Sequence, residues 1–185
     1  MKLFRMGMRM RMTKQLSGVA ILFLIFLPAS AQDRVSLADG RVSFVPPDGF
    51  HAMTEAEIKL KYPRGNAPRY VYSNEEMNVS IAITVSPQAV TLEGLPQLKA
   101  AMEQALPRMI PGLNWLSREI VQINGRPWVH FEMTSFAVDT DIHNEMYMTS
   151  FDGKMLGFNF NSTAAQHDRH KDALKRSRDT IRVVN

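Results

Sequence analysis

The chain has 185 residues and no cysteine, which excludes disulfide bonds, thiolate metal sites and a cysteine nucleophile. It carries 22 basic and 18 acidic residues, but five of the basic residues and none of the acidic ones precede Gln32. Residues 32–185 therefore hold 17 basic and 18 acidic side chains, a net charge of −1. A chain so balanced offers no basic surface for a nucleic acid, so we expect no nucleic-acid partner.

Residues 1–31 have the pattern of a secretory signal peptide. A basic start is followed by ten apolar residues at 18–27 and by Ala29-Ser30-Ala31, which is typical of cleavage near Ala31. The apolar run is shorter than the ~20 residues that span a bilayer. We expect a periplasmic or secreted protein with no stable membrane insertion after cleavage. The open alternatives are an uncleaved anchor and a translation start at Met12 instead of Met1.

The first elements of residues 32–185, which we take as a single domain, are short. Residues 41–45 alternate as a strand does and stop at the turn Pro46-Pro47-Asp48-Gly49-Phe50. Thr54-Glu55-Ala56-Glu57 is a capping box, so a helix should begin there and end before Pro63. The β-branched and aromatic residues at 69–72 and 78–85 predict two strands of a hairpin.

The longest predicted helix begins at Thr91. Its apolar residues recur at spacings of three and four, and we expect that stripe to lie across the apolar face that Val79, Ile81 and Ile83 give to the second hairpin strand. Pro107 should end or kink this helix.

Two hairpins dominate the second half of the chain. Asn124-Gly125 and Asp152-Gly153 each separate two strand-like runs, and both dipeptides favour the two-residue type I′ turn. Thr163-Ala164-Ala165-Gln166 reads as a second capping box before a polar helix at 168–178 with a thin apolar stripe. Residues 180–184 alternate again and form a last strand or the end of that helix.

Several of these sequence segments resemble those of the PsbP-like superfamily, and the resemblance covers about residues 41–184. They are the turn at 45–50, the long amphipathic helix, the hairpins at 123–128 and 151–154, and the closing Asp179-Thr180-Ile181. The resemblance implies an α+β fold, an α/β/α sandwich around a mostly antiparallel sheet. It also implies non-enzymatic work, in which members bind protein partners, assist assembly or hold metal ions; no partner-binding residue of the family carries over to this sequence.

The most concentrated polar segment is 139–145. If it is extended, Asp139, Asp141, His143 and Glu145 point to one side, and such a set could hold a divalent cation such as Ca²⁺, Mn²⁺ or Zn²⁺. The alternative is a solvated link between two strands, because same-side residues on a flat strand lie ~6.6–7 Å apart, too far for four ligands to share an ion.

Other candidate residues carry weaker signals. His167 and His170 share a helix face at a spacing that could chelate a cation, but Arg169 and Lys171 beside them favour a solvated surface. His51 and His130 are isolated in the sequence from the other candidate residues. Tyr70 and Tyr72 share one side of a strand, and we expect them to form an exposed partner-binding pair, since tyrosine is enriched at interfaces.

No known catalytic motif occurs in the sequence. The leading hypothesis is therefore an exported, non-enzymatic binding or assembly-assisting protein of the bacterial envelope, acting through a protein partner and without a cofactor. Two alternatives remain open. One is a metal-binding module that uses residues 139–145, and the other is a hydrolase whose site is assembled from distant residues.

Overall fold

The computed structural model describes residues 33–63, 65, 67–137 and 140–184, so the predicted leader lies outside the described residues. It has three helices and two antiparallel sheets, as expected for the α+β class. The helices are α1 (Glu55–Lys61), α2 (Leu95–Met109) and α3 (Ala164–Asp179). The strands are β1 (Val35–Leu37), β2 (Val42–Phe44), β3 (His51–Ala52), β4 (Tyr70–Ser73), β5 (Val79–Ala89), β6 (Asn114–Ile123), β7 (Arg126–Phe136), β8 (Asp141–Phe151), β9 (Lys154–Thr163) and β10 (Arg182–Val183).

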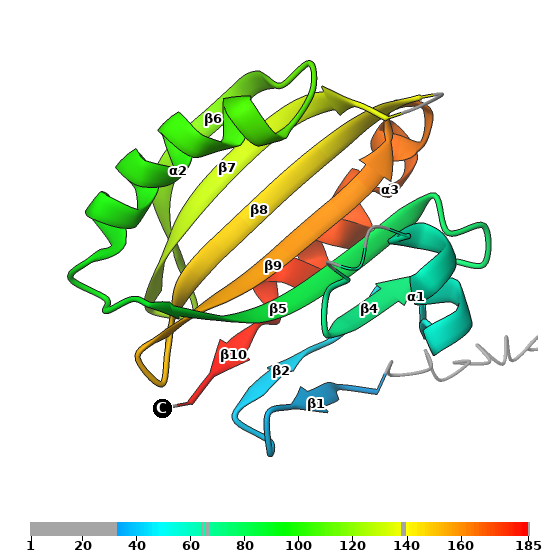
Figure 1. Cartoon of the computed structure of the whole chain (residues 1–185). Coiled ribbons are helices and arrows are strands. Elements are labelled where there is room, and N and C mark those ends of the chain that lie inside the picture. The colour runs from blue at the N-terminus through cyan, green and yellow to red at the C-terminus, as the bar shows by residue number, and fades with distance from the viewer. Residues whose placement is uncertain (1–32, 64, 66, 138–139, 185) are drawn as a thin grey trace, which may run out of the picture. The chain divides into compact units, whose positions relative to one another are not determined.

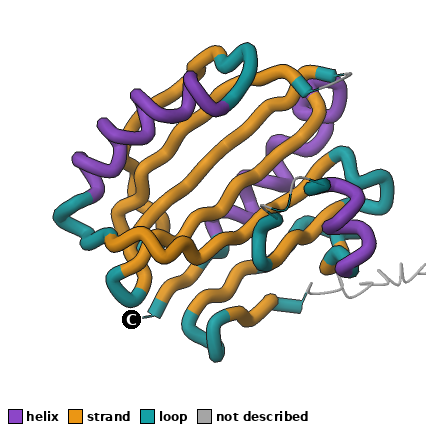
Figure 2. The backbone as a smooth tube through the Cα atoms, viewed as in Figure 1, coloured by secondary structure: helices purple, strands orange, loops and turns teal. Residues whose placement is uncertain are grey.

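The larger sheet has seven strands in the order β3-β4-β5-β9-β8-β7-β6. Helix α2 lies on one face, over β6 and β7, and α3 lies on the other (Figure 1). The smaller sheet, β1-β2-β10, packs into the same hydrophobic cluster as α3. Figure 2 shows the resulting layers, with helices on both sides of the long strands.

The hairpins form as predicted, because their turn residues adopt the backbone angles that a type I′ turn needs. The φ angles are 49° and 77° at Asn124-Gly125, and 50° and 70° at Asp152-Gly153. The first turn pairs Ile123 with Arg126 and joins β6 to β7. The second pairs Phe151 with Lys154 and joins β8 to β9. These two turns set the register of the strands that carry the candidate site.

Of the two predicted capping boxes, one forms. The Glu57 amide donates to the Thr54 hydroxyl at 3.3 Å, and the Thr54 amide donates to the Glu57 carboxylate at 2.6 Å. Thr163 is the N-cap of α3, as the sequence predicts, but its side chain makes no capping hydrogen bond.

The long helix differs from its prediction in start and facing, and it ends before Pro111-Gly112. It begins at Leu95, because Thr91 instead accepts the Gly94 amide in a turn. It continues through Pro107 to Met109, and the missing amide falls in its last turn.

Its apolar stripe packs on Val129, Phe131 and Met133 of β7. Val79, Ile81 and Ile83 point to the other face of the sheet, where α3 and the small sheet cover them. The prediction that the α2 stripe would cover these residues was wrong, since both faces of the sheet are apolar where a helix packs.

Smaller differences concern short strands and the bounds of the last helix. The strands β1 and β3 were not predicted. The last helix was predicted at 168–178, and α3 runs from Ala164 to Asp179. Its thin apolar stripe buries Leu174 and also Ser177, whose hydroxyl donates to the carbonyl of Val45 at 2.6 Å.

Candidate functional site

Polar side chains gather on the α3 face of the sheet, where β7 and β8 run side by side. Side chains alternate along a strand, so Trp128, His130 and Glu132 of β7 share this face. His143, Glu145 and Tyr147 of β8 share it as well. At one end of the face Trp128 and Tyr147 join the hydrophobic cluster that includes Leu174 of α3. Toward the other end the same strands present ionisable groups.

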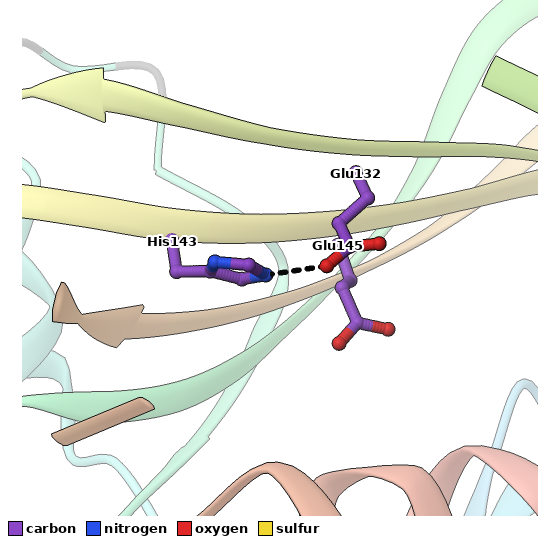
Figure 3. A group of neighbouring side chains, drawn as sticks. All are labelled: Glu132, His143 and Glu145. Atoms are coloured by element: carbon purple, nitrogen blue, oxygen red, sulfur yellow. Dashed lines mark hydrogen bonds and ion pairs between the residues drawn. The ribbon is translucent and has the colours of Figure 1, made fainter. Parts of the chain in front are cut away.

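Three of these groups, Glu132, His143 and Glu145, form what we call the Glu–His cluster (Figure 3). One ligand atom from each residue lies within 4.8 Å of the other two. The Nε2 atom of His143 is 2.9 Å from Oε1 of Glu132. The His143 side chain is 10% exposed and that of Glu132 is 30% exposed. The cluster is therefore shielded from water without being sealed off.

The imidazole of His143 is held by a second histidine. The ring of His167, from the first turns of α3, stacks on His143 with 3.5 Å between centroids and 23° between planes. Its Nδ1 lies 3.4 Å from the Ser162 hydroxyl of β9. Burial, and then the charge of His143, lower the pKa of His167. The stack therefore favours a neutral His167, because two stacked imidazolium ions would repel each other.

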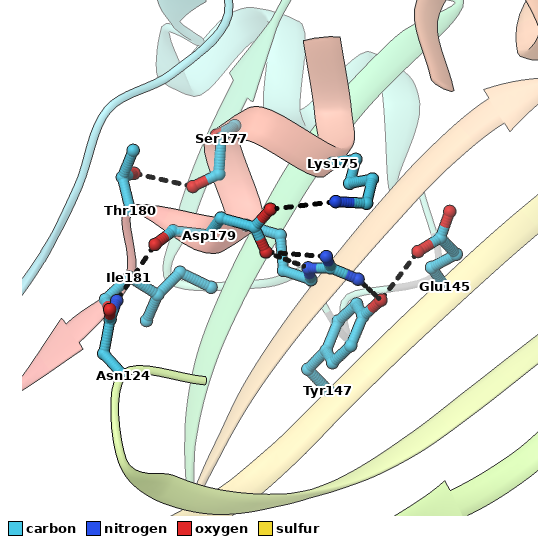
Figure 4. Close-up of polar contacts among 9 residues, drawn as sticks. Asn124, Glu145, Tyr147, Lys175, Ser177, Asp179, Thr180 and Ile181 are labelled. Carbon is cyan, nitrogen blue, oxygen red and sulfur yellow. Dashed lines mark hydrogen bonds and ion pairs between the residues drawn. The ribbon is translucent and has the colours of Figure 1, made fainter. Parts of the chain in front are cut away.

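A hydrogen-bonded chain fixes the carboxylate of Glu145 (Figure 4). The Tyr147 hydroxyl donates to Oε2 of Glu145 at 2.7 Å and accepts from Nη1 of Arg178 at 3.1 Å. The guanidinium of Arg178 also pairs with Asp179 at 2.6 Å. Burial and the Glu145 charge raise the pKa of the Tyr147 phenol above its ordinary value. Tyr147 thus remains a neutral donor, and α3 positions Glu145 through it.

His130 lies beside this cluster, on β7. It is 7% exposed, and neither of its ring nitrogens has a hydrogen-bond partner among the described residues. Its ring stacks on Tyr147 with 4.5 Å between centroids. The nearest carboxylate, Oε1 of Glu119, is 3.6 Å from Nδ1, too long for a hydrogen bond. Burial lowers the pKa of His130, and the three neighbouring glutamates only partly offset that effect.

The structure brings together half of the predicted metal-ligand set. His143 and Glu145 lie in the Glu–His cluster, because the segment is the first part of strand β8 and not an irregular link. Asp141 is exposed and does not belong to the cluster, and Asp139 lies outside the described residues.

Glu132 was missed. It stands directly opposite Glu145 in the β7–β8 register, and the Glu132–His130 alternation on the strand after Asn124-Gly125 is the signal that predicts it.

The predicted tyrosine pair is half-buried, not exposed. Tyr70 and Tyr72 both pack against the hydrophobic cluster, and the ring of Tyr72 meets Phe44 edge-on at 5.2 Å. Their use as a partner-binding pair stays a prediction, with less free surface than the sequence suggested.

The remaining histidines differ from one another in their contacts. His51 lies 3.4 Å from Glu57, the carboxylate of the α1 capping box. His167 has turned toward the sheet, whereas His170 lines a shallow surface depression with Ala173 and Ser177. The two histidines therefore do not form the chelating pair that their spacing allowed.

The hydrolase alternative gains no support from the same contacts. Among the described residues, the Ser162 hydroxyl lies 3.4 Å from Nδ1 of His167, but Ser162 is only 2% exposed, so its hydroxyl is shielded from a substrate in this structure.

The opposite face of the same strands holds a groove of about 620 Å³, lined by residues of α2 and of the end of α1. We call it the methionine groove. Strand residues Asn144, Gly157 and Asn159 contribute to its floor, and Lys61 and Tyr62 of the α1 region line one end. Five methionines line it, which are Met102, Met109, Met146, Met148 and Met155.

Comparisons with known proteins agree on the fold. The solution structure of cyanobacterial PsbP (CyanoP) from Synechocystis sp. PCC 6803 matches with a TM-score of 0.54 and 14% identity, over 82% of this chain and 92% of that one. The crystal structure of LpqN, described as involved in cell envelope biogenesis of Mycobacterium tuberculosis, matches with a TM-score of 0.56 and 11% identity, over 83% of this chain and 90% of that one. A Bacteroides thetaiotaomicron structure matches with a TM-score of 0.55 and 8% identity, over 82% of this chain and 48% of that one.

The sequence itself matches no protein-family model. No curated protein matches it significantly either. The PsbP-like fold that the sequence predicted is therefore confirmed by structure, at identities that show the fold alone. Within the described residues, no helix has the length and apolarity needed to cross a membrane.

Proposed function

We propose that this protein is an exported, non-enzymatic binding protein of the bacterial envelope that holds an apolar segment of a partner protein in the methionine groove. The observation that carries the proposal is the groove itself, an opening of about 620 Å³ on the sheet face where α2 lies mainly over β6 and β7. Binding sites for small and extended ligands are typically clefts of ~300–1,000 Å³ lined by apolar side chains.

The lining favours an apolar partner of variable shape. Methionine is unbranched and polarizable, so a methionine surface adapts to different side chains. Met109 is 72% exposed, although it lies beside other apolar residues of the groove. A large exposed apolar side chain at the edge of an open groove is a feature of interaction sites.

The low charge of the groove favours a partner segment that carries no charge of its own. Among the described residues that line it, Lys61 carries the only charge. Its ammonium donates to the carbonyl of Met77 at 2.6 Å, and burial lowers its pKa. An apolar segment avoids the cost of placing its own charges in this surface.

Export and an envelope role rest on other observations. The basic, apolar and small-residue pattern of residues 1–31 supports secretion. A structural neighbour with the same fold, LpqN, is described as involved in cell envelope biogenesis. The sequence carries no known catalytic motif, which supports action by binding.

A photo-crosslinking experiment tests the proposal. A benzophenone amino acid replaces Met109 at the groove, and in a matched control it replaces Leu116, which is 51% exposed on β6 and does not line the groove. We expect the Met109 probe, and not the Leu116 probe, to form an adduct in cells. Peptide mapping should place the adduct in an apolar segment of an exported protein.

The substitution Gly157→Val provides the specificity test. A Cβ at this position would meet Cγ of Met148 at 3.9 Å and the carbonyl oxygen of Thr84 at 4.0 Å, which are ordinary contacts. Valine should therefore fit the strand while filling the groove floor, and the Met109 adduct should disappear. An adduct that survives Gly157→Val, or equal adducts from both probes, would contradict the proposal.

A further inference from the structure

Two carboxylates face each other on the α3 face of the sheet. Glu132 of β7 is the direct cross-strand partner of Glu145 of β8, and like charges in that position destabilise a sheet. Arg178 contacts the Tyr147 hydroxyl and Asp179. Glu132 contacts Nε2 of His143 and Glu145 accepts from Tyr147, and a bound cation would offset the repulsion that remains between the two glutamates.

A second observation points to a ligand at the same place. His130 is more than nine-tenths buried on the same face, two residues along β7 from Glu132. Neither of its ring nitrogens makes a hydrogen bond with the described residues, and the carboxylate of Glu119 stays 3.6 Å from Nδ1. A buried polar group without a hydrogen bond is costly, and in native proteins it often marks a site for water or an ion. The ring of His130 stacks on Tyr147, whose hydroxyl donates to Glu145, so His130 borders the same cluster.

We propose that Glu132, His143 and Glu145 bind one divalent transition-metal ion of the Zn²⁺ class. Donor atoms around such an ion, bound at about 2.0–2.2 Å, lie roughly 3–4 Å apart. The three donors lie within 4.8 Å of one another, and small rotations of the two glutamate side chains close the remaining distance. A mixed imidazole and carboxylate set suits Zn²⁺ or a similar ion, whereas Ca²⁺ takes oxygen ligands.

The groups around the three donors are arranged as in metal sites. Ligating carboxylates are usually held by hydrogen bonds of their own. Tyr147 holds one oxygen of Glu145, and Arg178 holds Tyr147. The stacked ring of His167 fixes the plane of His143. Tyr147, Arg178 and His167 are thus positioning residues for the ion, and they are drawn from β8 and α3.

The site is independent of the methionine groove, since it lies on the other face of the sheet. It can therefore be tested apart from the partner-binding function. The full chain is purified without a tag, made metal-free with a chelator and titrated with ZnCl₂ by calorimetry. We expect saturable binding of one ion per chain and no comparable binding of CaCl₂.

Two variants and two controls assign the site. Glu132→Gln and His143→Gln should each weaken Zn²⁺ binding at least about tenfold. Asp141→Asn on β8 and His170→Gln on α3 lie outside the cluster and should leave the affinity unchanged. Glu132 is partly exposed, so its variant is expected to fold even where the buried His143→Gln does not.

A thermal melt gives a second measure, because an ion that binds only the folded state raises the melting temperature. Zn²⁺ should raise it for the parent protein and not for Glu132→Gln. The proposal is overturned by the absence of saturable Zn²⁺ binding, by equal binding of Ca²⁺, or by an affinity that Glu132→Gln leaves unchanged.

Discussion

The two faces of the long strands differ in the kind of side chain that they present. On the α3 face, Trp128, Tyr147, Phe158 and Phe160 pack edge-on or stacked with centroids 5.8–6.4 Å apart. On the α2 face, β8 and β9 present Met146, Met148 and Met155 instead. Aromatic rings pack in few geometries, whereas methionine adapts to many. The aromatic packing on the α3 face therefore favours one fixed arrangement, whereas the methionines on the α2 face can adapt to a bound segment.

The largest expected effect comes from removing an aromatic ring on the α3 face. Phe158→Ala should lower the free energy of unfolding by about 3–5 kcal/mol, because Phe158 is 1% exposed and its loss leaves a cavity. Met155→Ala, three residues away and half-buried at the groove, should cost less than about 2 kcal/mol. Urea denaturation measures both, and equal losses would contradict the difference between the faces.

A middle-sized effect should follow the loss of one hydroxyl. Tyr147→Phe removes the hydrogen bonds to Glu145 and Arg178 and should lower the free energy of unfolding by about 1–2 kcal/mol. Tyr72→Phe is the matched control, because the Tyr72 ring is half-buried and its hydroxyl makes no hydrogen bond with the described residues. If the two variants lose equal stability, the polar chain from α3 to Glu145 does not contribute.

A smaller effect should appear with pH. Burial lowers the pKa values of His130 and His167, so the unfolded chain binds protons to these residues at a higher pH than the folded chain does. Their contribution is complete above the unfolded histidine pKa of about 6.5 and is lost as pH falls through the lowered folded values. In metal-free buffer, unfolding midpoints between pH 7.5 and 5 should fall more for the parent than for His130→Phe. An unchanged slope in the variant would contradict this assignment.

The smallest effect on stability is expected at the groove. Gly157→Val should change the free energy of unfolding by no more than about 0.5 kcal/mol, because the added Cβ makes only ordinary contacts and valine suits a strand better than glycine does. Thermal or urea unfolding of the parent and the variant checks it. A loss above about 2 kcal/mol would mean that the groove floor is packed and not open.

The sequence predicted the elements whose geometry is decided locally. The capping box at Thr54 and the turns at Asn124-Gly125 and Asp152-Gly153 depend on residues within a few positions of one another, and all three form. The prediction of the sheet face that α2 covers was wrong, because this face depends on where α3 and the small sheet pack. That outcome depends on residues far away in the chain.

The candidate site was half predictable for a related reason. His143 and Glu145 share one strand, so period-two alternation alone puts them on one side. Glu132 joins them only through the β7–β8 register. The methionine groove could not be read from spacing, since its methionines come from α2, β8 and β9 and look like ordinary core residues in each element.

The pairing of β2 with β10 has a consequence for how the chain folds. Val42 pairs with Val183, and the Val45 amide donates to the Thr180 hydroxyl at 2.8 Å, so the cover over Phe44 is assembled from segments far apart in sequence. Closing a long loop costs entropy before its contacts form, and folds rich in distant contacts fold slowly. β1 and β2 pair locally, but β2 cannot gain its second partner until β10 has been synthesised. We therefore expect the addition of β10 to the small sheet to be a late step of folding.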